Sequence, residues 1–301
     1  NQNVKNKGMI AKTTSNMEKP ILDQLIQLRR QIHQYPEISG EEVKTAAAVV
    51  AFFKDLKYTH IETQVGGTGV LVTFDSGKAG KSLLFRAELD GLPIQEVNDM
   101  AHKSVYEGKG HQCGHDGHLT MLAGVGAWLS ENPPKSGKVH LIFQPAEENG
   151  EGAKAVMNGE RFKALKFDEV YALHNLPGYP LGQIVVKENS FTAAVNSIII
   201  KIKGKTSHAA EPEKGLSPSL AVAEILSGLE AFQNNDPKLA DFRLITPVYV
   251  TMGSQDYGIS AGDAEIHLTL RSWTNEGLAE LEQLVIQLAD EVCKTHHLAF
   301  D

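Results

Sequence analysis

Apolar residues in the first part of the chain follow two kinds of pattern. Residues 21–34 repeat apolar positions every three or four residues, which predicts an amphipathic helix that Pro36 ends. A second, Ala- and Val-rich helix is predicted over residues 39–53. Residues 69–74 and 81–87 are short apolar runs between glycine-rich turns, which predicts two buried strands.

The next part of the chain repeats this alternation. Residues 118–131 predict a helix that is apolar on most sides and therefore interior. Residues 138–148 ("KVHLIFQPAEE") and 169–178 ("EVYALHNLPG") each predict a strand that runs into a polar tip. Strands that alternate with helices and end in polar clusters predict an α/β layered domain, with its functional site at one edge of the sheet.

The pattern changes near Gly182. From Ser197 onward the predicted order is strand, helix, strand, strand, helix. This βαββα order is typical of a split, ferredoxin-like α+β unit that lacks only its last strand. The sequence therefore predicts a boundary at about residue 187, between a larger domain of residues 1–187 and a smaller domain of residues 188–301.

Composition excludes several classes of function. The chain has 301 residues, 42% of them hydrophobic, and a net charge of -8, which suits two cores of ordinary size. The acidic balance without a basic stripe argues against nucleic acid and against anionic membranes, and no apolar run reaches the ~20 residues of a membrane span. The first residues lack the apolar core of a signal peptide and predict a disordered leader. Two cysteines, Cys113 and Cys293, are too few for a disulfide framework, which favours a reducing cytoplasm.

Side chains that can bind metal ions gather at predicted strand ends and glycine turns. They lie in four clusters, "RAELDGLP" (86–93), "HQCGHDGH" (111–118), "QPAEENGEG" (144–152) and "LHNLPG" (173–178). Together the clusters supply a thiolate, imidazoles and paired carboxylates, the mixture that binds a borderline divalent ion such as zinc or manganese. Each cluster by itself would more often be a solvated turn, whereas four at equivalent strand ends favour one site.

The spacing of Cys113 and His115 limits how they can act. On a helix, residues two apart diverge by about 200°. On an extended loop they project from the same side, and Gly114 between them permits a turn. Both side chains can then reach one metal site. A supporting role that fixes ring orientation is expected for Asp116 and His118, although Asp116 could equally cap the following helix.

The carboxylates of Glu147 and Glu148 predict a division of labour. Neighbouring side chains at a strand tip point in opposite directions, so one can bind a metal ion while the other faces the metal-bound water. A metal ion lowers the pKa of bound water to about 7, and the second carboxylate can accept its proton and later protonate the departing amine. His174, at the end of the next strand, is a third type of ligand.

A cysteine nucleophile is the main alternative chemistry. Cys113 has histidines beside it, but a thiol protease needs its base placed by the fold. This alternative also gives no role to Glu147, Glu148 and His174. A third interpretation treats Cys113 as a small buried apolar residue, which is how free cysteines commonly pack.

Six strings resemble the co-catalytic metal amidohydrolases, a family that includes aminoacylase, hippurate hydrolase and the auxin–amino-acid conjugate hydrolases. The strings, in order, are "LRRQIHQYPEISGEE", "RAELDGLPIQE", "HQCGHDGHLTML", "FQPAEENGEGAKAVM", "HNLP" and "GKTSHAAEP". The resemblance implies two divalent metal ions, zinc or manganese, as cofactors. Their implied ligands are Cys113, His115, Glu148 and His174. It also implies that Glu147 is the general acid/base and that Asp90 orients the site.

The same resemblance implies a substrate and an assembly. Enzymes of this family cleave the amide bond of N-acyl amino acids or related peptide-like molecules, and their small domain acts as a lid and dimerisation platform, which predicts a homodimer. His208 resembles the histidine that polarises the scissile carbonyl, and Arg271 resembles an arginine that binds a substrate carboxylate. Two departures are Glu88, where the family usually has aspartate, and a missing asparagine in residues 254–265.

The family pattern also continues beyond the lid, where the chain returns to complete the catalytic domain and supplies a last metal-binding histidine. This sequence ends at Asp301, and His296 and His297 follow the lid helix too closely to replace that histidine. They are therefore expected to be surface residues of the tail. The catalytic domain is expected to lack its final strands and one ligand, with weak or no activity in the chain as given. A non-catalytic module that pairs through its lid and only binds a ligand is the alternative function.

Overall fold

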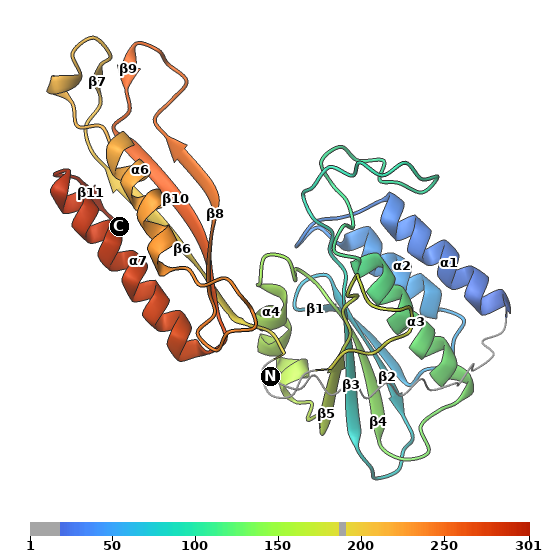
Figure 1. Ribbon diagram of the computed structural model, residues 1–301. Coiled ribbons are helices and arrows are strands. Elements are labelled where there is room, and N and C mark those ends of the chain that lie inside the picture. Colours follow the sequence, from blue (N-terminus) through green and yellow to red (C-terminus); the bar gives the residue numbers. More distant parts are fainter. Residues whose placement is uncertain (1–18, 187–190) are drawn as a thin grey trace. The chain divides into compact units, whose positions relative to one another are not determined.

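The computed structural model of the protein describes residues 19–186 and 191–301 (Figure 1). Its residues divide between Gln183 and Ile184 into two compact units, which are considered separately below. The expected leader, over residues 1–18, and the predicted domain boundary at residue 187 lie outside the described residues. No helix in the described part of the chain has the length and apolar character needed to cross a membrane.

The larger unit is built on a five-stranded mixed sheet with the strand order β1-β2-β4-β3-β5. Its strands are β1 (His60–Val65), β2 (Gly69–Asp75), β3 (Ser82–Glu88), β4 (Lys138–Gln144) and β5 (Glu169–Ala172). β1 and β2 pair antiparallel, as do β2 and β4, whereas β3 runs parallel to both β4 and β5. The segments that leave the carboxyl ends of β3, β4 and β5 therefore emerge at the same edge of the sheet.

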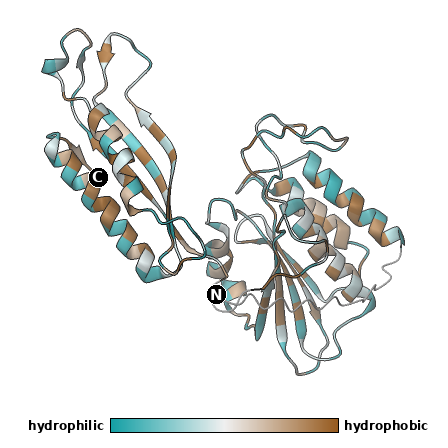
Figure 2. Ribbon diagram, in the orientation of Figure 1, coloured by the Kyte–Doolittle hydropathy of each residue, from teal (hydrophilic) through white to brown (hydrophobic). Residues whose placement is uncertain are grey.

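Three helices cover one face of this sheet, and two short ones lie against the other. The helices are α1 (Lys19–Gln34), α2 (Val43–Phe53), α3 (His115–Glu131), α4 (Gly152–Asn158) and α5 (Glu160–Lys163). In β2, Val70 and Val72 belong to the core cluster that includes residues of α1, α2 and α3, while Leu71 belongs to a second cluster with Val156 of α4. Burial on both faces explains why the strand is a continuous apolar run (Figure 2).

The smaller unit has a four-stranded antiparallel sheet with the order β11-β6-β10-β8, packed against two helices. Its main elements are β6 (Ala194–Lys203), α6 (Ser219–Gly228), β8 (Arg243–Met252), β10 (Asp263–Ser272), α7 (Asn275–Thr295) and β11 (Ala299–Phe300). The minor elements are β7 (Ser207–His208), β9 (Ile259–Ser260) and the 3₁₀ turns η1 (Pro212–Lys214) and η2 (Leu229–Phe232). The order along the chain, βαββαβ, is that of the predicted ferredoxin-like unit.

One detail of that prediction is wrong. The sequence pattern indicated that the last strand of the ferredoxin-like unit is lacking, but β11 pairs antiparallel with β6, with Phe300 opposite Ile202. A strand of two residues is too short to produce a recognisable alternation of apolar and polar positions. The start of α7 agrees with its sequence, because Thr274 is its N-cap and accepts a hydrogen bond from the amide of Gly277 at 3.0 Å.

Candidate metal centre

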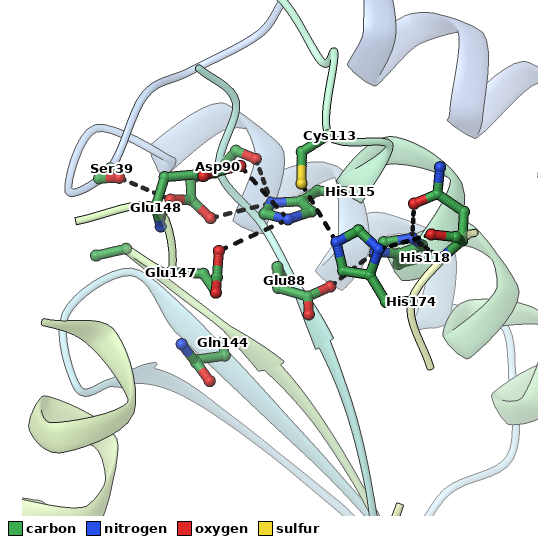
Figure 3. A network of polar contacts seen from close by, with 12 residues as sticks. Ser39, Glu88, Asp90, Cys113, His115, His118, Gln144, Glu147, Glu148 and His174 are labelled. Carbon is green, nitrogen blue, oxygen red and sulfur yellow. Dashed lines mark hydrogen bonds and ion pairs between the residues drawn. The ribbon is translucent and has the colours of Figure 1, made fainter. Parts of the chain in front are cut away.

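Segments far apart in the sequence meet at the edge of the larger sheet where β3, β4 and β5 end (Figure 3). Asp90 follows β3, Glu147 and Glu148 follow β4, and His174 follows β5, while Cys113 lies just before α3. Among the described residues there are three groups of possible metal ligands, and within each group the ligand atoms lie within 4.8 Å of one another. The groups are Cys113, His115 and His174; His115, Glu147 and Glu148; and Glu88, His115 and His118.

The turn before α3 brings Cys113 and His115 together. Gly114 has φ 92°, a left-handed conformation that favours glycine, and α3 begins at the next residue. Cys113 Sγ lies 3.3 Å from His174 Nε2. The sequence predicted an extended loop through both residues, whereas the backbone changes direction at Gly114 and His115 begins a helix. The result is the same, because both side chains face the candidate metal centre.

His115 is fully buried and is oriented by Asp90. Its Nδ1 lies 2.8 Å from the main-chain oxygen of Asp90 and 3.4 Å from Asp90 Oδ1, so Nδ1 faces only acceptors and carries the proton. Nε2 is buried without a hydrogen-bond partner, 3.7 Å from Glu148 Oε1 and 3.8 Å from Glu147 Oε2. Burial alone would lower the pKa of His115, but Asp90 and the acidic residues around the ring raise it. The acidic side chains around Nε2 therefore favour a positively charged group at this position.

Glu147 and Glu148 both face His115 (Figure 3). The prediction that they point in opposite directions is therefore wrong. β4 ends at Gln144, and Ala146 has φ 47°, so the alternation of an extended strand does not continue to the glutamates. Their surroundings still differ: Glu148 Oε1 is buried without a partner, whereas the side chain of Glu147 is 38% exposed. Burial raises the pKa of Glu147, and the neighbouring charge of Glu148 raises it further.

Asp90 contacts both His115 and the turn that carries Glu148. Its Oδ2 accepts hydrogen bonds from Ser39 Oγ at 2.7 Å and from the amide of Glu148 at 2.9 Å. Burial would raise the pKa of Asp90, but the neighbouring His115 ring and these hydrogen bonds outweigh it and hold the pKa at about 2. Asp90 therefore stays ionised while it contacts both His115 and the backbone of Glu148, as the predicted orienting role requires.

Glu88, which stands where the resembled family usually has aspartate, is a further candidate ligand. It is buried at the end of β3, where it pairs with Arg86 and lies 3.0 Å from His118 Nδ1. His118 Nε2 lies 2.9 Å from Asn175 Oδ1. The spacing of His115 and His118 could have indicated this arrangement, because residues three apart share one face of a helix.

Asp116 points away from the centre. Its Oδ2 lies 2.9 Å from His33 Nδ1 and 2.7 Å from Arg29 Nε, both on α1. Asp116 therefore joins the first turn of α3 to α1. Both predicted roles are wrong, because its side chain neither orients a ligand ring nor caps α3. On its other side, His33 Nε2 lies 3.0 Å from Glu96 Oε1.

We expect His33 to make the stability of the protein depend on pH. The hydrogen bond to Asp116 raises the pKa of His33, against burial, and Glu96 raises it further. Charged His33 therefore stabilises the fold fully below the unfolded pKa of about 6.5, and this contribution is lost as the pH rises through the higher folded-state pKa. His33→Gln should flatten this part of the pH profile of the unfolding free energy, measured by urea denaturation. Exposed His60→Gln is the control, and an unchanged profile in His33→Gln would contradict the assignment.

The remaining predicted site residues lie in the smaller unit. His208, in β7, is exposed and its Nδ1 accepts a hydrogen bond from the amide of Ala210 at 3.1 Å. Arg271, in β10, is also exposed. His296 Nε2 lies 2.8 Å from Glu224 Oε2 of the same unit, and His297 is exposed.

Comparison with known proteins identifies the family. The model of "Peptidase family M20/M25/M40" matches residues 84–297, which include all the predicted metal ligands. This chain belongs to the M20 family. It is 32% identical over 270 residues to the N-acetyldiaminopimelate deacetylase of Halalkalibacterium halodurans, covering 89% of this chain and 72% of that protein. It is 31% identical over 270 residues to the N-acetyl-L-cysteine deacetylase of Bacillus subtilis, covering 89% of this chain and 64% of that protein.

A solved structure extends the similarity to the fold. It is a dinuclear metal-binding peptidase of the M20 family from Bacillus subtilis, with a TM-score of 0.71 and 28% sequence identity over 94% of this chain and 75% of that one. The predicted resemblance to metal-dependent amidohydrolases is thus confirmed, as is the α/β catalytic domain with a smaller α+β domain.

The M20 chain described here has a centre that fits metal ions. At this centre, three of the buried polar atoms have no hydrogen-bond partner, namely His115 Nε2, Glu148 Oε1 and Asp90 Oδ1. Buried polar atoms without partners are costly, and a cation that neutralises the surrounding carboxylates would remove this cost. Nitrogen, oxygen and sulfur donors are all available, and the similarity to a dinuclear metal-binding peptidase supports two metal ions.

Proposed function

We propose that this chain hydrolyses the amide bond of N-acyl amino acids or related small amides. The observation that carries this proposal is the pair Glu147 and Glu148 facing the partner-free Nε2 of buried His115. A carboxylate pair beside a cation site provides both a ligand and a separate group for proton transfer. Relatives that remove acetyl groups from diaminopimelate and cysteine support the choice of substrate class.

We assign the metal ligands as Cys113, His115, Glu148 and His174. Glu148 is preferred over Glu147 as a ligand because its Oε1 is buried without a partner and its amide is held by Asp90. Divalent ions bound there would polarise the substrate carbonyl. They would also lower the pKa of the attacking water, so that it can give up a proton as it attacks the carbonyl carbon. Zinc and manganese both suit the mixed donors.

Glu147 then acts as the general acid/base. Its carboxylate is more exposed than that of Glu148, so it can meet water and substrate, and its raised pKa suits a group that must both accept and return a proton. It accepts the proton of the attacking water and donates it to the nitrogen of the leaving amino acid. Asp90 contributes by keeping the His115 ring in one orientation.

The cysteine-nucleophile alternative is disfavoured by electrostatics. Burial and the charge of Glu148 raise the pKa of Cys113 to about 12. A nucleophilic cysteine instead needs a lowered pKa, usually from a cationic partner. Thiolate formation at Cys113 therefore calls for a cation at the centre, which agrees with a ligand role.

The substrate-binding roles of His208 and Arg271 rest on the family resemblance. Both side chains are exposed, and the planar fork of Arg271 suits bidentate binding of an amino-acid carboxylate. Replacing Arg271 by leucine should raise KM for N-acyl amino acids more than it lowers kcat. An unchanged KM would contradict the role.

A panel of N-acyl amino acids tests the proposed function. Zinc- or manganese-loaded protein should release free amine from acetyl or larger acyl derivatives, and a metal chelator should stop the release. The panel also determines which acyl group is preferred. Full-length, metal-loaded protein that releases no amine from any member would contradict the proposal and favour the non-catalytic alternative.

We also propose that the protein is a homodimer paired through the smaller unit. β8 is an edge strand of its sheet and carries the exposed apolar residues Val248, Tyr249, Val250 and Met252. Such an edge favours pairing with a second strand. Sedimentation should show a dimer that Val250→Lys weakens and that Ile286→Lys, on the exposed face of α7, does not. A monomeric protein would contradict this.

The two free cysteines, Cys113 and Cys293, support a cytoplasmic location.

A further inference from the structure

We propose that Glu42 is a positioning residue that aims Glu147 at the metal centre. The proposal rests on the proposed function, because it assumes that Glu147 transfers the proton. Glu42 does not touch His115 or the predicted ligands and would act through the backbone of the turn that carries Glu147 and Glu148.

Glu42 is completely buried, yet it forms no ion pair with a lysine or arginine in the described residues. Its Oε1 accepts hydrogen bonds from the amides of Ala146 at 2.7 Å and Gly40 at 2.9 Å, and its Oε2 accepts one from Thr68 Oγ1 at 2.7 Å. It is also the N-cap residue of α2, where the helix dipole favours a negative charge. Burial of a carboxylate is costly without such contacts, so these hydrogen bonds hold the Glu42 side chain in one position.

Ala146 is the residue that needs this anchor. Its φ of 47° is a left-handed conformation that residues with a Cβ rarely adopt and that persists only where the surroundings impose it. Its amide donates to Glu42, and its carbonyl accepts a hydrogen bond from the amide of Gly152 at 2.9 Å. A Cβ at Gly152 would lie 1.6 Å from the oxygen of Pro145, so the turn is closed tightly from the other side.

Two buried carboxylates therefore hold alternate amides of this turn. Glu42 binds the amide of Ala146, and Asp90 binds the amide of Glu148. Glu147 lies between the two anchored residues, and its direction follows from theirs. Without Glu42, Ala146 can relax to a negative φ and rotate Glu147, while Glu148 keeps its own link to Asp90. Loss of Glu42 should thus impair proton transfer while metal binding survives.

Glu37 provides a matched control at the same helix. Its Oε2 accepts hydrogen bonds from the amide of Thr45 at 2.8 Å and from Thr45 Oγ1 at 3.0 Å, in the first turn of α2. In the described part of the chain, the hydrogen bonds of the Glu37 side chain go to Thr45 and not to residues 145–152. Glu37→Ala therefore perturbs the start of α2, as Glu42→Ala does, but leaves the amide of Ala146 in place.

The test compares Glu42→Ala, Glu42→Gln and Glu37→Ala in the metal-loaded protein. Because small misplacements of a reacting group are costly, Glu42→Ala should lower kcat by about 10²-fold, with KM and metal stoichiometry close to wild type. Hydrogen–deuterium exchange over residues 145–150 should become faster. Glu42→Gln keeps an oxygen that can accept from Ala146 and should restore most of kcat and protection. Glu37→Ala should change neither.

The outcomes separate the proposal from its alternatives. Wild-type kcat and exchange in Glu42→Ala would overturn it, as would an equal loss in Glu37→Ala or a parallel loss of bound metal. If Glu42→Ala does not fold, Glu42→Asp, whose shorter carboxylate draws back from Ala146, should show the same loss of kcat and protection, and wild-type values there would overturn the proposal. If the wild type hydrolyses no N-acyl amino acid, the proposed function fails, while the exchange comparison still decides whether Glu42 anchors the turn.

Discussion

Glu147→Gln should reduce kcat for N-acyl amino acid hydrolysis by about 10²–10⁴-fold, the contribution expected of a general acid/base. Glutamine has nearly the same shape as glutamate but cannot accept and return a proton at neutral pH. Glu148 cannot take over this role, because its Oε1 lies in the buried part of the centre and its backbone is fixed by Asp90. The measurement is release of free amine at saturating substrate.

Glu151→Gln is the matched control for this experiment. Glu151 lies in the same turn but is exposed, and it should retain wild-type turnover. Both variants should bind as much metal as the wild type, measured by elemental analysis of the purified protein. If Glu147→Gln turned over substrate at the wild-type rate, the assignment of the acid/base would be wrong.

His115→Asn should cause the protein to lose metal from the whole centre. His115 belongs to all three groups of possible ligands, so its imidazole is shared in a way that the other donors are not. We expect activity to fall by more than about 100-fold, beyond the 10–100-fold typical of residues that only support a ligand. The metal content per chain should fall in parallel, and raising the free metal concentration should restore it only in part.

His140→Asn is the control for loss of a buried histidine from the same domain. His140 is buried in β4, where its Nδ1 lies 3.0 Å from Thr73 Oγ1, and it belongs to none of the ligand groups. This variant should keep its metal even if it is less stable. Full metal occupancy in His115→Asn would exclude His115 as a ligand and would contradict the proposed centre.

The larger secondary-structure elements were predictable because their apolar patterns are strong. Strand β2 was recognised from an apolar run that the structure buries on both faces, and α7 from the helical pattern of residues 275–294. Strand β1 was missed. Its sequence "HIETQV" alternates irregularly and most of it is partly exposed, because it lies at an edge of the sheet, where pairing with β2 and not burial defines it.

By itself, the sequence determined which donors are present and the class of chemistry they can support. A cysteine two residues before a histidine, a later Glu-Glu pair and a histidine at a strand end are local facts. They were sufficient to predict a divalent metal site with a carboxylate for proton transfer, and the resemblance of six strings to a known family implied a metal-dependent amidohydrolase. The tertiary structure decided which side chains face one another. Glu42 and Ala146 are 104 residues apart, and no pattern along the chain links them. The same holds for Asp116, which faces His33 and not the adjacent ligand. Such contacts arise only when the sheet places distant segments at one edge, because hydrogen-bond partners are selected by distance in space.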